Sequence, residues 1–134
     1  MIQERVRLES EAILVVLRRV RTGEIKLVTS STSLAENRRD SLPKRRRRSR
    51  SVLRMATVHV DFDEADIQRA KQLHKAGFGQ ADAMHVVAAE KAGCDALLTT
   101  DDQLIRKAAQ HKSIRVRVRN PVDWAMEVRH DNQT

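Results

Sequence analysis

The hydrophobic pattern of this chain switches repeatedly between the period of a helix and the period of a strand. In residues 9–21 apolar side chains recur every three or four positions, which predicts an amphipathic helix. Residues 25–31 (IKLVTSS) then have the pattern of a short strand, and a second helix is expected to open near Thr32 or Ser33. Pro43 indicates the start of a third helix, because proline is favoured at the first helical position.

The second half of the chain continues this alternation. The pattern predicts a strand over 57–63, a helix capped by Asp63 and Asp66, a helix over 80–92 closed by Gly93, a strand over 95–100, a helix over 102–110 and a strand over 114–119. The strand at 95–100 (DALLTT) is too apolar for a half-exposed position, so we expect it inside a parallel sheet. Residues 114–119 (IRVRVR) alternate strictly, which predicts an edge strand whose arginine face protects the edge or, as a second interpretation, contacts phosphate.

Strands that alternate with helices predict an α/β fold with a parallel sheet. The chain has 134 residues, the usual size of one domain, so we expect a single domain over residues 1–134. A lone cysteine, Cys94, and an N-terminus unlike a signal peptide together favour a cytoplasmic protein. No apolar run reaches the length of a membrane span, so we expect no membrane partner.

Basic charge is concentrated in one segment. Residues 38–54 (RRDSLPKRRRRSRSVLR) hold nine of the 26 lysines and arginines and one acid, a net charge of +8, while the rest of the chain carries 17 basic and 17 acidic residues. The sequence therefore describes a neutral domain with one cationic segment. We expect that segment to attract RNA phosphates through Lys44, Arg45, Arg46, Arg47, Arg48 and Arg50. The alternatives are a solvated helix face and, more weakly, a localisation signal.

Carboxylates follow two of the predicted strands and open the helix between them. Asp101 and Asp102 come directly after the apolar strand, Glu36 follows the first strand, and Asp82 lies in the first turn of an alanine-rich helix. Ligand sites in open α/β sheets lie beyond the carboxyl ends of the strands, so we expect these acids at one rim. Clustered carboxylates resist ionising together, and they usually hold a hard divalent cation such as Mg²⁺ or Mn²⁺.

Taken one at a time, each of these acids has an ordinary interpretation. Asp82, Asp101 and Asp102 are well placed to stabilise helix N-termini, and Glu36 is interpretable as an exposed helix residue. His85, one turn after Asp82, is interpreted as a structural histidine on the buried helix face. The metal hypothesis depends on the set of acids and not on any single member.

Residues 81–124 carry a specific combination of motifs. In ADAMHVVAAEKAGCDALLTTDDQLIRKA and the later VRVRNPVDW, an Asp-Ala-x-His helix precedes Gly-x-Asp-x-Leu-x-Thr-x-Asp and a strand ending in Asn-Pro. This combination resembles the C-terminal half of PIN domains, the fold of the virulence-associated protein C type toxins of toxin–antitoxin systems. Upstream, ERVRLESEAIL and KLVTSSTSLAE extend the resemblance more weakly over nearly the whole chain.

The resemblance implies a three-layer α/β/α fold and a metal-dependent endoribonuclease that hydrolyses RNA phosphodiesters. It implies Mg²⁺ or Mn²⁺ as cofactor, RNA as substrate, an antitoxin peptide as a partner that blocks the acidic cleft, and a homodimer. By position, the resemblance implies Glu36, Asp82 and Asp101 as catalytic acids and metal ligands, with Asp102 as a further ligand and Thr99 as a supporting hydroxyl.

The start of the chain departs from the family pattern. The family begins with an apolar strand that ends in a metal-binding Asp, whereas this sequence opens with MIQERVRL. The comparison therefore implies a PIN fold without its first central strand. We expect the strands at 25–31 and 95–100 to lack a shared neighbour, which exposes backbone donors and acceptors that water or another chain must satisfy. The alternative function is a degenerate, non-catalytic PIN domain that acts as an RNA-binding or protein-interaction module.

Overall fold

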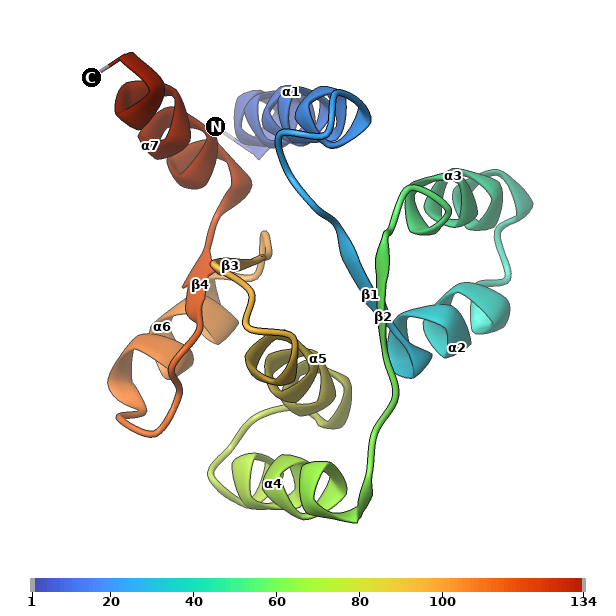
Figure 1. Cartoon of the computed structure of the whole chain (residues 1–134), viewed down its shortest axis with the longest axis vertical. Helices are drawn as coiled ribbons and strands as arrows, with labels where there is room; N and C mark the ends of the chain where they lie inside the picture. The colour runs from blue at the N-terminus through green and yellow to red at the C-terminus, as the bar shows by residue number, and fades with distance from the viewer. Residues whose placement is uncertain (1, 134) are drawn as a thin grey trace.

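The computed structural model describes residues 2–133, and the side chains of residues 2–127, as a mixed α/β fold (Figure 1). The order of elements is α1 (Ile2–Arg21), β1 (Val28–Ser30), α2 (Ser31–Arg39), α3 (Pro43–Leu53), β2 (Val58–Val60), α4 (Glu64–Lys75), α5 (Gln80–Lys91), β3 (Ala96–Leu98), α6 (Asp102–Gln110), β4 (Arg117–Arg119) and α7 (Pro121–Gln133). The predicted alternation of strands and helices is confirmed.

The strands form two separate sheets of two parallel strands each. β1 pairs with β2, with Val28 opposite Val58, and β3 pairs with β4, with Ala96 opposite Arg117. Within the described residues no strand joins β1 to β3, which confirms that they lack a shared neighbour. The interior position expected for residues 95–100 is wrong: β3 has a strand on one side only, and its residues are half-buried because nothing covers the other edge.

Helix α5 is the element that both sheets share. It contacts β1 and β3 and packs along α4. Its buried side chains are small, which lets the helix lie close to two sheets at once. The core around it combines Leu73 of α4 and Phe78 with apolar side chains of α5, α6 and β4. Both sheets therefore pack against the same helix, α5, at the centre of the molecule.

Local sequence signals set the ends of α4 and α5. The side chain of Asp63 accepts a hydrogen bond from the backbone N–H of Asp66 at 2.9 Å, and Asp66 accepts one from Asp63 at the same distance. This reciprocal pair is the predicted cap of α4. Gly93 has φ +67°, a left-handed conformation that residues with a Cβ rarely adopt, and it follows the end of α5 as predicted.

Helix α1 is longer than predicted and only partly covered. It begins at Ile2, not at residue 9, and it lies against α7 (Figure 1). Ala12 and Val16 are buried, whereas Leu8 and Ile13, on the predicted apolar face, remain 42% and 40% exposed. No helix within residues 2–133 is long and apolar enough to cross a membrane.

The strand β4 lies at a sheet edge, as the alternating IRVRVR pattern predicts. Val116 and Val118 are buried in the core. On the opposite face Arg117 and Arg119 form ion pairs with Glu127 of α7, at 2.6 Å and 3.3 Å. Part of the arginine face therefore holds α7 in place, which favours the structural interpretation over phosphate contact.

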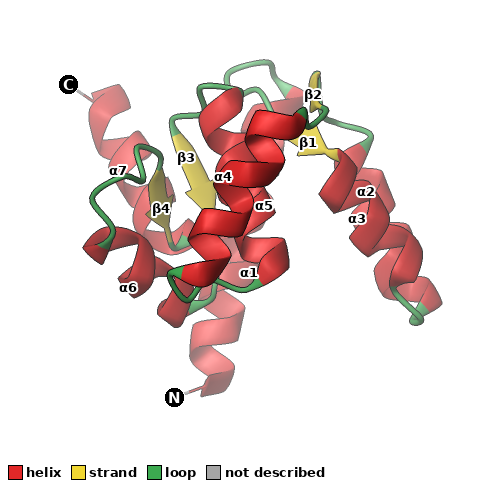
Figure 2. Cartoon of the chain, turned by 90° about the horizontal axis from the view of Figure 1, so that it is seen from below, coloured by secondary structure: helices red, strands yellow, loops and turns green. Residues whose placement is uncertain are grey.

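Helices α2 and α3 form a hairpin that projects from the body of the molecule, and we call this hairpin the basic arm (Figure 2). α2 contacts α5 and packs along α3. The cationic segment 38–54 thus runs from the end of α2 through α3, and Pro43 begins α3 as predicted.

Truncation of a buried side chain on α4 is expected to lower the stability of the fold strongly. Leu73 is fully buried, so Leu73→Ala should lower the free energy of unfolding by about 2–5 kcal/mol because it leaves a cavity. Ile67→Ala, on the same helix but 36% exposed, is the control and should cost less than about 1 kcal/mol. Urea denaturation followed by circular dichroism measures both, and equal losses would contradict this account of the core.

Candidate functional site

Three of the predicted acids lie near one another at the carboxyl ends of the strands. Burial raises the pKa of the Asp82 carboxyl above its ordinary value, the negative charge of Asp101 raises it further, and Glu36 adds a smaller contribution. These contributions place Asp101 and Glu36 within electrostatic range of Asp82, and the charge of Lys107 opposes them. They agree with the predicted rim of acids at the start of α5.

Asp82 is held at this rim by the first turn of α5. Its carboxylate folds back over Gly79, so that a Cβ built on Gly79 would lie 3.3 Å from Oδ2 of Asp82. The site is half-buried, which explains why loss of hydration is the largest cause of the raised pKa. A glycine before the helix thus leaves the space in which this carboxylate lies.

Asp101 has a structural role as well as a place at the rim. Its Oδ1 accepts hydrogen bonds from the backbone N–H groups of Gln103 at 2.9 Å and Leu104 at 3.2 Å, which caps α6. Its own N–H donates to Oγ1 of Thr99 at 3.1 Å. Thr99 therefore supports the backbone of Asp101, and among the described contacts Oδ2 of Asp101 has no hydrogen-bond partner.

His85 joins the site through Glu36. Its Nε2 lies 3.0 Å from Oε1 of Glu36, and its side chain is half-buried between α5 and α2. His85 was predicted to be a structural histidine and not a site residue. The available signal was its spacing, because a residue three positions after Asp82 lies on the same face of a helix.

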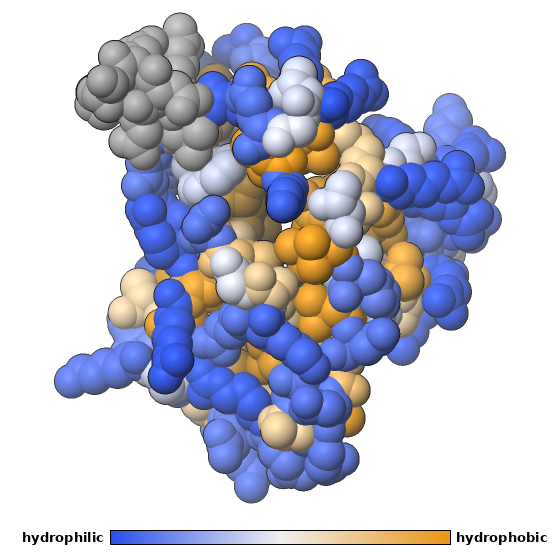
Figure 3. All heavy atoms as spheres, in the orientation of Figure 1, coloured by the Kyte–Doolittle hydropathy of each residue, from blue (hydrophilic) through white to orange (hydrophobic). Residues whose placement is uncertain are grey.

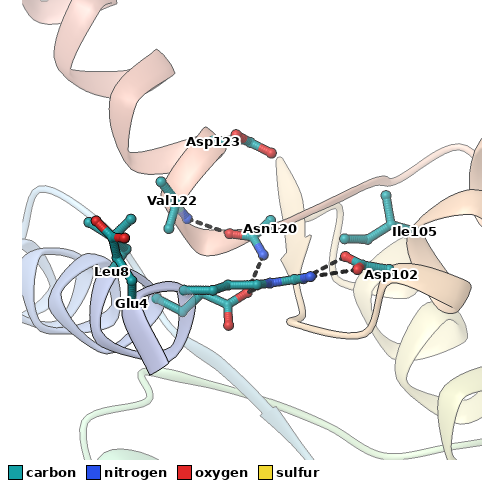
Figure 4. A pocket seen from close by; sticks show the side chains of 9 residues that line it. Glu4, Leu8, Asp102, Ile105, Asn120, Val122 and Asp123 are labelled. Atoms are coloured by element: carbon teal, nitrogen blue, oxygen red, sulfur yellow. Dashed lines mark hydrogen bonds and ion pairs between the residues drawn. The ribbon is translucent and has the colours of Figure 1, made fainter. Parts of the chain in front are cut away.

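Asp102 faces a different part of the molecule. Arg5 of α1 donates two hydrogen bonds to its carboxylate, at 2.7 Å and 2.6 Å, and this contact holds the pKa of Asp102 below its usual value (Figure 4). Arg5 also bonds to Glu9 at 3.3 Å, and Asn120 donates to Glu9 at 2.5 Å. These residues line a cavity of about 480 Å³ between α1, α6 and α7. Glu36 and Asp101 thus lie within electrostatic range of Asp82, whereas Asp102 is turned towards α1.

The carboxylates suit a hard divalent cation by their chemistry, and their mutual repulsion at Asp82 is of the kind that a cation relieves. They are not a closed coordination shell: among the side chains of residues 2–127, no three His, Cys, Asp or Glu groups are close enough together to hold a metal ion. The acids therefore suit a divalent cation by their oxygen donors and negative charge, but their positions do not form a complete coordination shell.

The basic arm presents its charge to solvent. Lys44, Arg47, Arg48 and Arg50 are exposed, and within the described contacts their side chains form no ion pair or hydrogen bond. Arg45 differs, because it donates to both oxygens of Asp40, at 2.5 Å and 2.9 Å. Four of the six predicted phosphate-binding cations are thus free in this structure, Arg45 is neutralised by Asp40, and Arg46 donates to the Asp40 backbone at 3.1 Å.

Comparison with known protein families gives one match. A family model for the PIN domain matches residues 5–110 of the chain. Neither the curated proteins nor the solved structures contain a match. The matched region includes Glu36, Asp82 and Asp101, together with the whole basic arm.

The negative charge of Asp101 is expected to influence the titration of Asp82. Asp101→Asn removes a negative charge near Asp82, so the pKa of Asp82 should fall towards its ordinary value. Asparagine keeps the oxygen that caps α6, so the fold should persist. Carboxyl ¹³C NMR measures the titration, with Asp95→Asn as a control because Asp95 lies at the opposite ends of the strands. An unchanged Asp82 titration in Asp101→Asn would show that the two acids are not neighbours.

Proposed function

The chain belongs to the PIN domain family, whose members are generally nucleases, and from that membership we propose that it is a metal-dependent endoribonuclease that hydrolyses RNA phosphodiesters. The observation that supports this function most directly is the raised pKa of Asp82 beside Asp101 and Glu36. A structural set of helix caps does not require two further acids to lie near one half-buried carboxyl. A nuclease site does, because it must hold cations beside a phosphodiester.

PIN domains typically use a divalent metal ion, and we propose Mg²⁺ or Mn²⁺ here. Glu36, Asp82 and Asp101 would hold it, with Asp102 as an additional ligand if Arg5 releases it. When bound, the ion supplies positive charge that stabilises the phosphodiester during hydrolysis. Thr99 keeps the loop of Asp101 in position through its hydrogen bond to the Asp101 backbone.

His85 extends this proposal beyond the acids. Its hydrogen bond to Glu36 fixes the orientation of that carboxylate. In the proposed enzyme His85 is a positioning residue for Glu36.

The basic arm supplies RNA affinity in this proposal. Its exposed cations attract phosphates without reading bases, so the arm binds RNA of many sequences. We further propose the toxin role that the motif combination suggests, in the cytoplasm and as a homodimer. An antitoxin peptide with basic side chains would then oppose the acidic rim.

The second candidate is an RNA-binding or protein-interaction module without catalysis. It is favoured by the absence of a closed metal shell among residues 2–127 and by the contact that ties Asp102 to Arg5. Both candidates share the basic arm, and they differ only in whether the rim acids act together on a cation. Metal-dependent cleavage distinguishes them.

Removal of a rim acid should abolish cleavage and the response to metal. Asp101→Asn should lose more than about 100-fold of the RNA cleavage rate and should no longer gain thermal stability from Mg²⁺ or Mn²⁺. Cleavage of a labelled structured RNA and melting temperatures in metal or in EDTA measure the two effects. Asp95→Asn, at the other strand ends, is the matched control. Tight RNA binding by the parent chain without cleavage in either metal would favour the non-catalytic module.

The arm should contribute salt-dependent binding without base preference. Replacement of Arg47, Arg48 and Arg50 by Gln should weaken RNA binding equally for all sequences and reduce the salt slope by about 0.7 for each lost contact to single-stranded RNA. Replacement of Arg18, Arg19 and Arg21 of α1 by Gln removes the same charge and is the control. Fluorescence anisotropy at several salt concentrations measures the slopes, and equal slopes in the two variants would assign α3 to a solvated surface.

A further inference from the structure

The exposed face of α3 carries one hydroxyl group, which belongs to Ser51. Lys44, Arg47 and Arg48 precede Ser51 by seven, four and three positions, so they lie on the same face of the helix. Arg54 follows Ser51 by three positions and is exposed as well. Figure 3 shows strongly hydrophilic residues over α3, at the right of the view, and the helix contains no acidic residue. Ser51 is therefore a hydroxyl surrounded by cations.

The hydroxyl of Ser51 lies at the surface and is weakly held. Its Oγ donates a hydrogen bond to the backbone oxygen of Arg47 at 3.0 Å. A bond of this kind, from a serine to the preceding turn, slightly destabilises a helix, so its loss costs little. The bond uses the hydroxyl proton and leaves the lone pairs of Oγ free to react.

Helix α3 can also open without disturbing the rest of the molecule. It packs along α2 and has no other extensive contact within the described residues. Its basic residues repel one another at spacings of three and four positions. A segment with few packing contacts opens locally at a low cost in free energy. An enzyme that binds extended chain can therefore reach Ser51 while the body of the molecule stays folded.

The neighbouring serines have different surroundings. Ser49 is half-buried and lines a crevice of about 350 Å³ between α2 and α3, together with Glu36 and Asp40. Ser41 directly follows Asp40 in the loop between the helices. A phosphate beside a carboxylate is disfavoured by repulsion between like charges, whereas one beside arginine is stabilised. Within the basic arm, Ser51 is thus the serine whose surroundings favour a phosphate.

From these observations we propose that Ser51 is a phosphorylation site. The enzyme is a serine kinase that binds basic segments, and the phosphoryl donor is a nucleoside triphosphate. Oγ of Ser51 forms a bond to the γ-phosphorus, and the bond from that phosphorus to the nucleoside diphosphate breaks. A base of the kinase takes the hydroxyl proton. The run of cations before the serine suits an acidic kinase cleft, because such charge patterns determine which substrates a kinase accepts.

The phosphate changes the charge that the arm presents to solvent. It carries a charge of about −2 and three acceptor oxygens, and it pairs with Arg47 and Arg48 at four and three positions along the helix. These two cations are then no longer available to RNA. Phosphorylation thereby lowers the RNA affinity of the arm. This consequence rests on the proposed function, whereas the pairing of the phosphate with arginine does not.

Phosphoserine installed genetically in place of Ser51 tests the pairing without RNA and without a kinase. In ³¹P NMR, the second pKa of this phosphate should lie below that of phosphoserine in a short peptide without basic residues, because the cations favour the doubly charged form. Phosphoserine in place of Ser10, on the exposed surface of α1 between Glu9 and Glu11, is the control and should show no such decrease. Phosphoserine in place of Ser49 should have a raised pKa and should lower the melting temperature.

Phosphate incorporation tests the choice of serine. The folded chain is incubated with ATP and a serine kinase that is specific for arginine-rich substrates, and mass spectrometry locates the phosphate. Ser51→Ala should reduce incorporation about fivefold, because the preferred acceptor is lost. Ser49→Ala keeps Ser51 and should leave incorporation nearly unchanged.

RNA binding tests the consequence for the arm. Phosphoserine in place of Ser51 should weaken the binding of single-stranded RNA about tenfold at low salt and reduce the salt slope by about 1.4, the value for two lost phosphate contacts. Phosphoserine in place of Ser10 adds the same charge outside the arm and should leave the slope unchanged. Ser51→Ala removes the acceptor without adding charge and should bind as the parent chain does.

Three results would overturn the proposal. A second pKa at Ser51 equal to that in the short peptide would show that no cations pair with the phosphate. Equal incorporation in Ser51→Ala and the parent chain would assign the modification to another serine. Salt-dependent RNA binding that phosphoserine at this position does not weaken would remove the effect on the arm. Absence of RNA binding by the parent chain would instead contradict the proposed function, and the NMR and incorporation measurements would still decide whether Ser51 is the site.

Discussion

The structure depends on the contact of one helix, α5, with two sheets that share no strand. Each sheet has only two strands, which is too few for independent stability, so its position is set by the surfaces that cover it. The small buried residues of α5 let β1 and β3 both approach the same helix. Asp82 lies in the first turn of α5, so the packing of α5 also positions the acidic rim.

The rim brings like charges together, and the surrounding structure offsets their repulsion only in part. His85 contacts Glu36, and the backbone N–H groups at the start of α6 bind Asp101. Among the described residues none donates a hydrogen bond to the Asp82 carboxylate, and burial raises its pKa more than the charge of Asp101 does. Because a carboxyl with a raised pKa binds its proton more tightly in the folded state, the stability of the fold falls as pH rises through its titration. In the proposed enzyme, a cation at the rim would reduce this cost.

Local signals made much of the fold predictable, and long-range contacts account for the rest. The capping pair Asp63 and Asp66, Gly93 and the residues of α6 follow from short-range chemistry, and the structure places them as predicted. The half-burial of β3 was missed because apolar composition indicates what a strand prefers to contact, and not whether a neighbour is present. The ion pair between Arg5 and Asp102 spans 97 positions, so no local pattern indicates it. The rim of acids stays a prediction that rests on the general rule for strand ends in α/β folds, and the raised pKa of Asp82 agrees with it.

The basic arm and the acidic rim are mechanically connected through α2. Glu36 lies on the part of α2 that contacts the body, and the next residue, Asn37, is buried and donates a hydrogen bond to the backbone of Arg46 on α3 at 2.8 Å. In the proposed RNA complex, a phosphate bound by α3 would therefore lie at a nearly fixed offset from Glu36. Attraction to the arm falls with salt because its cations are exposed, whereas the interactions at the half-buried rim are screened much less. The fold thus places exposed cations on one helix of the hairpin and Glu36 on the other, where that helix contacts the body of the molecule.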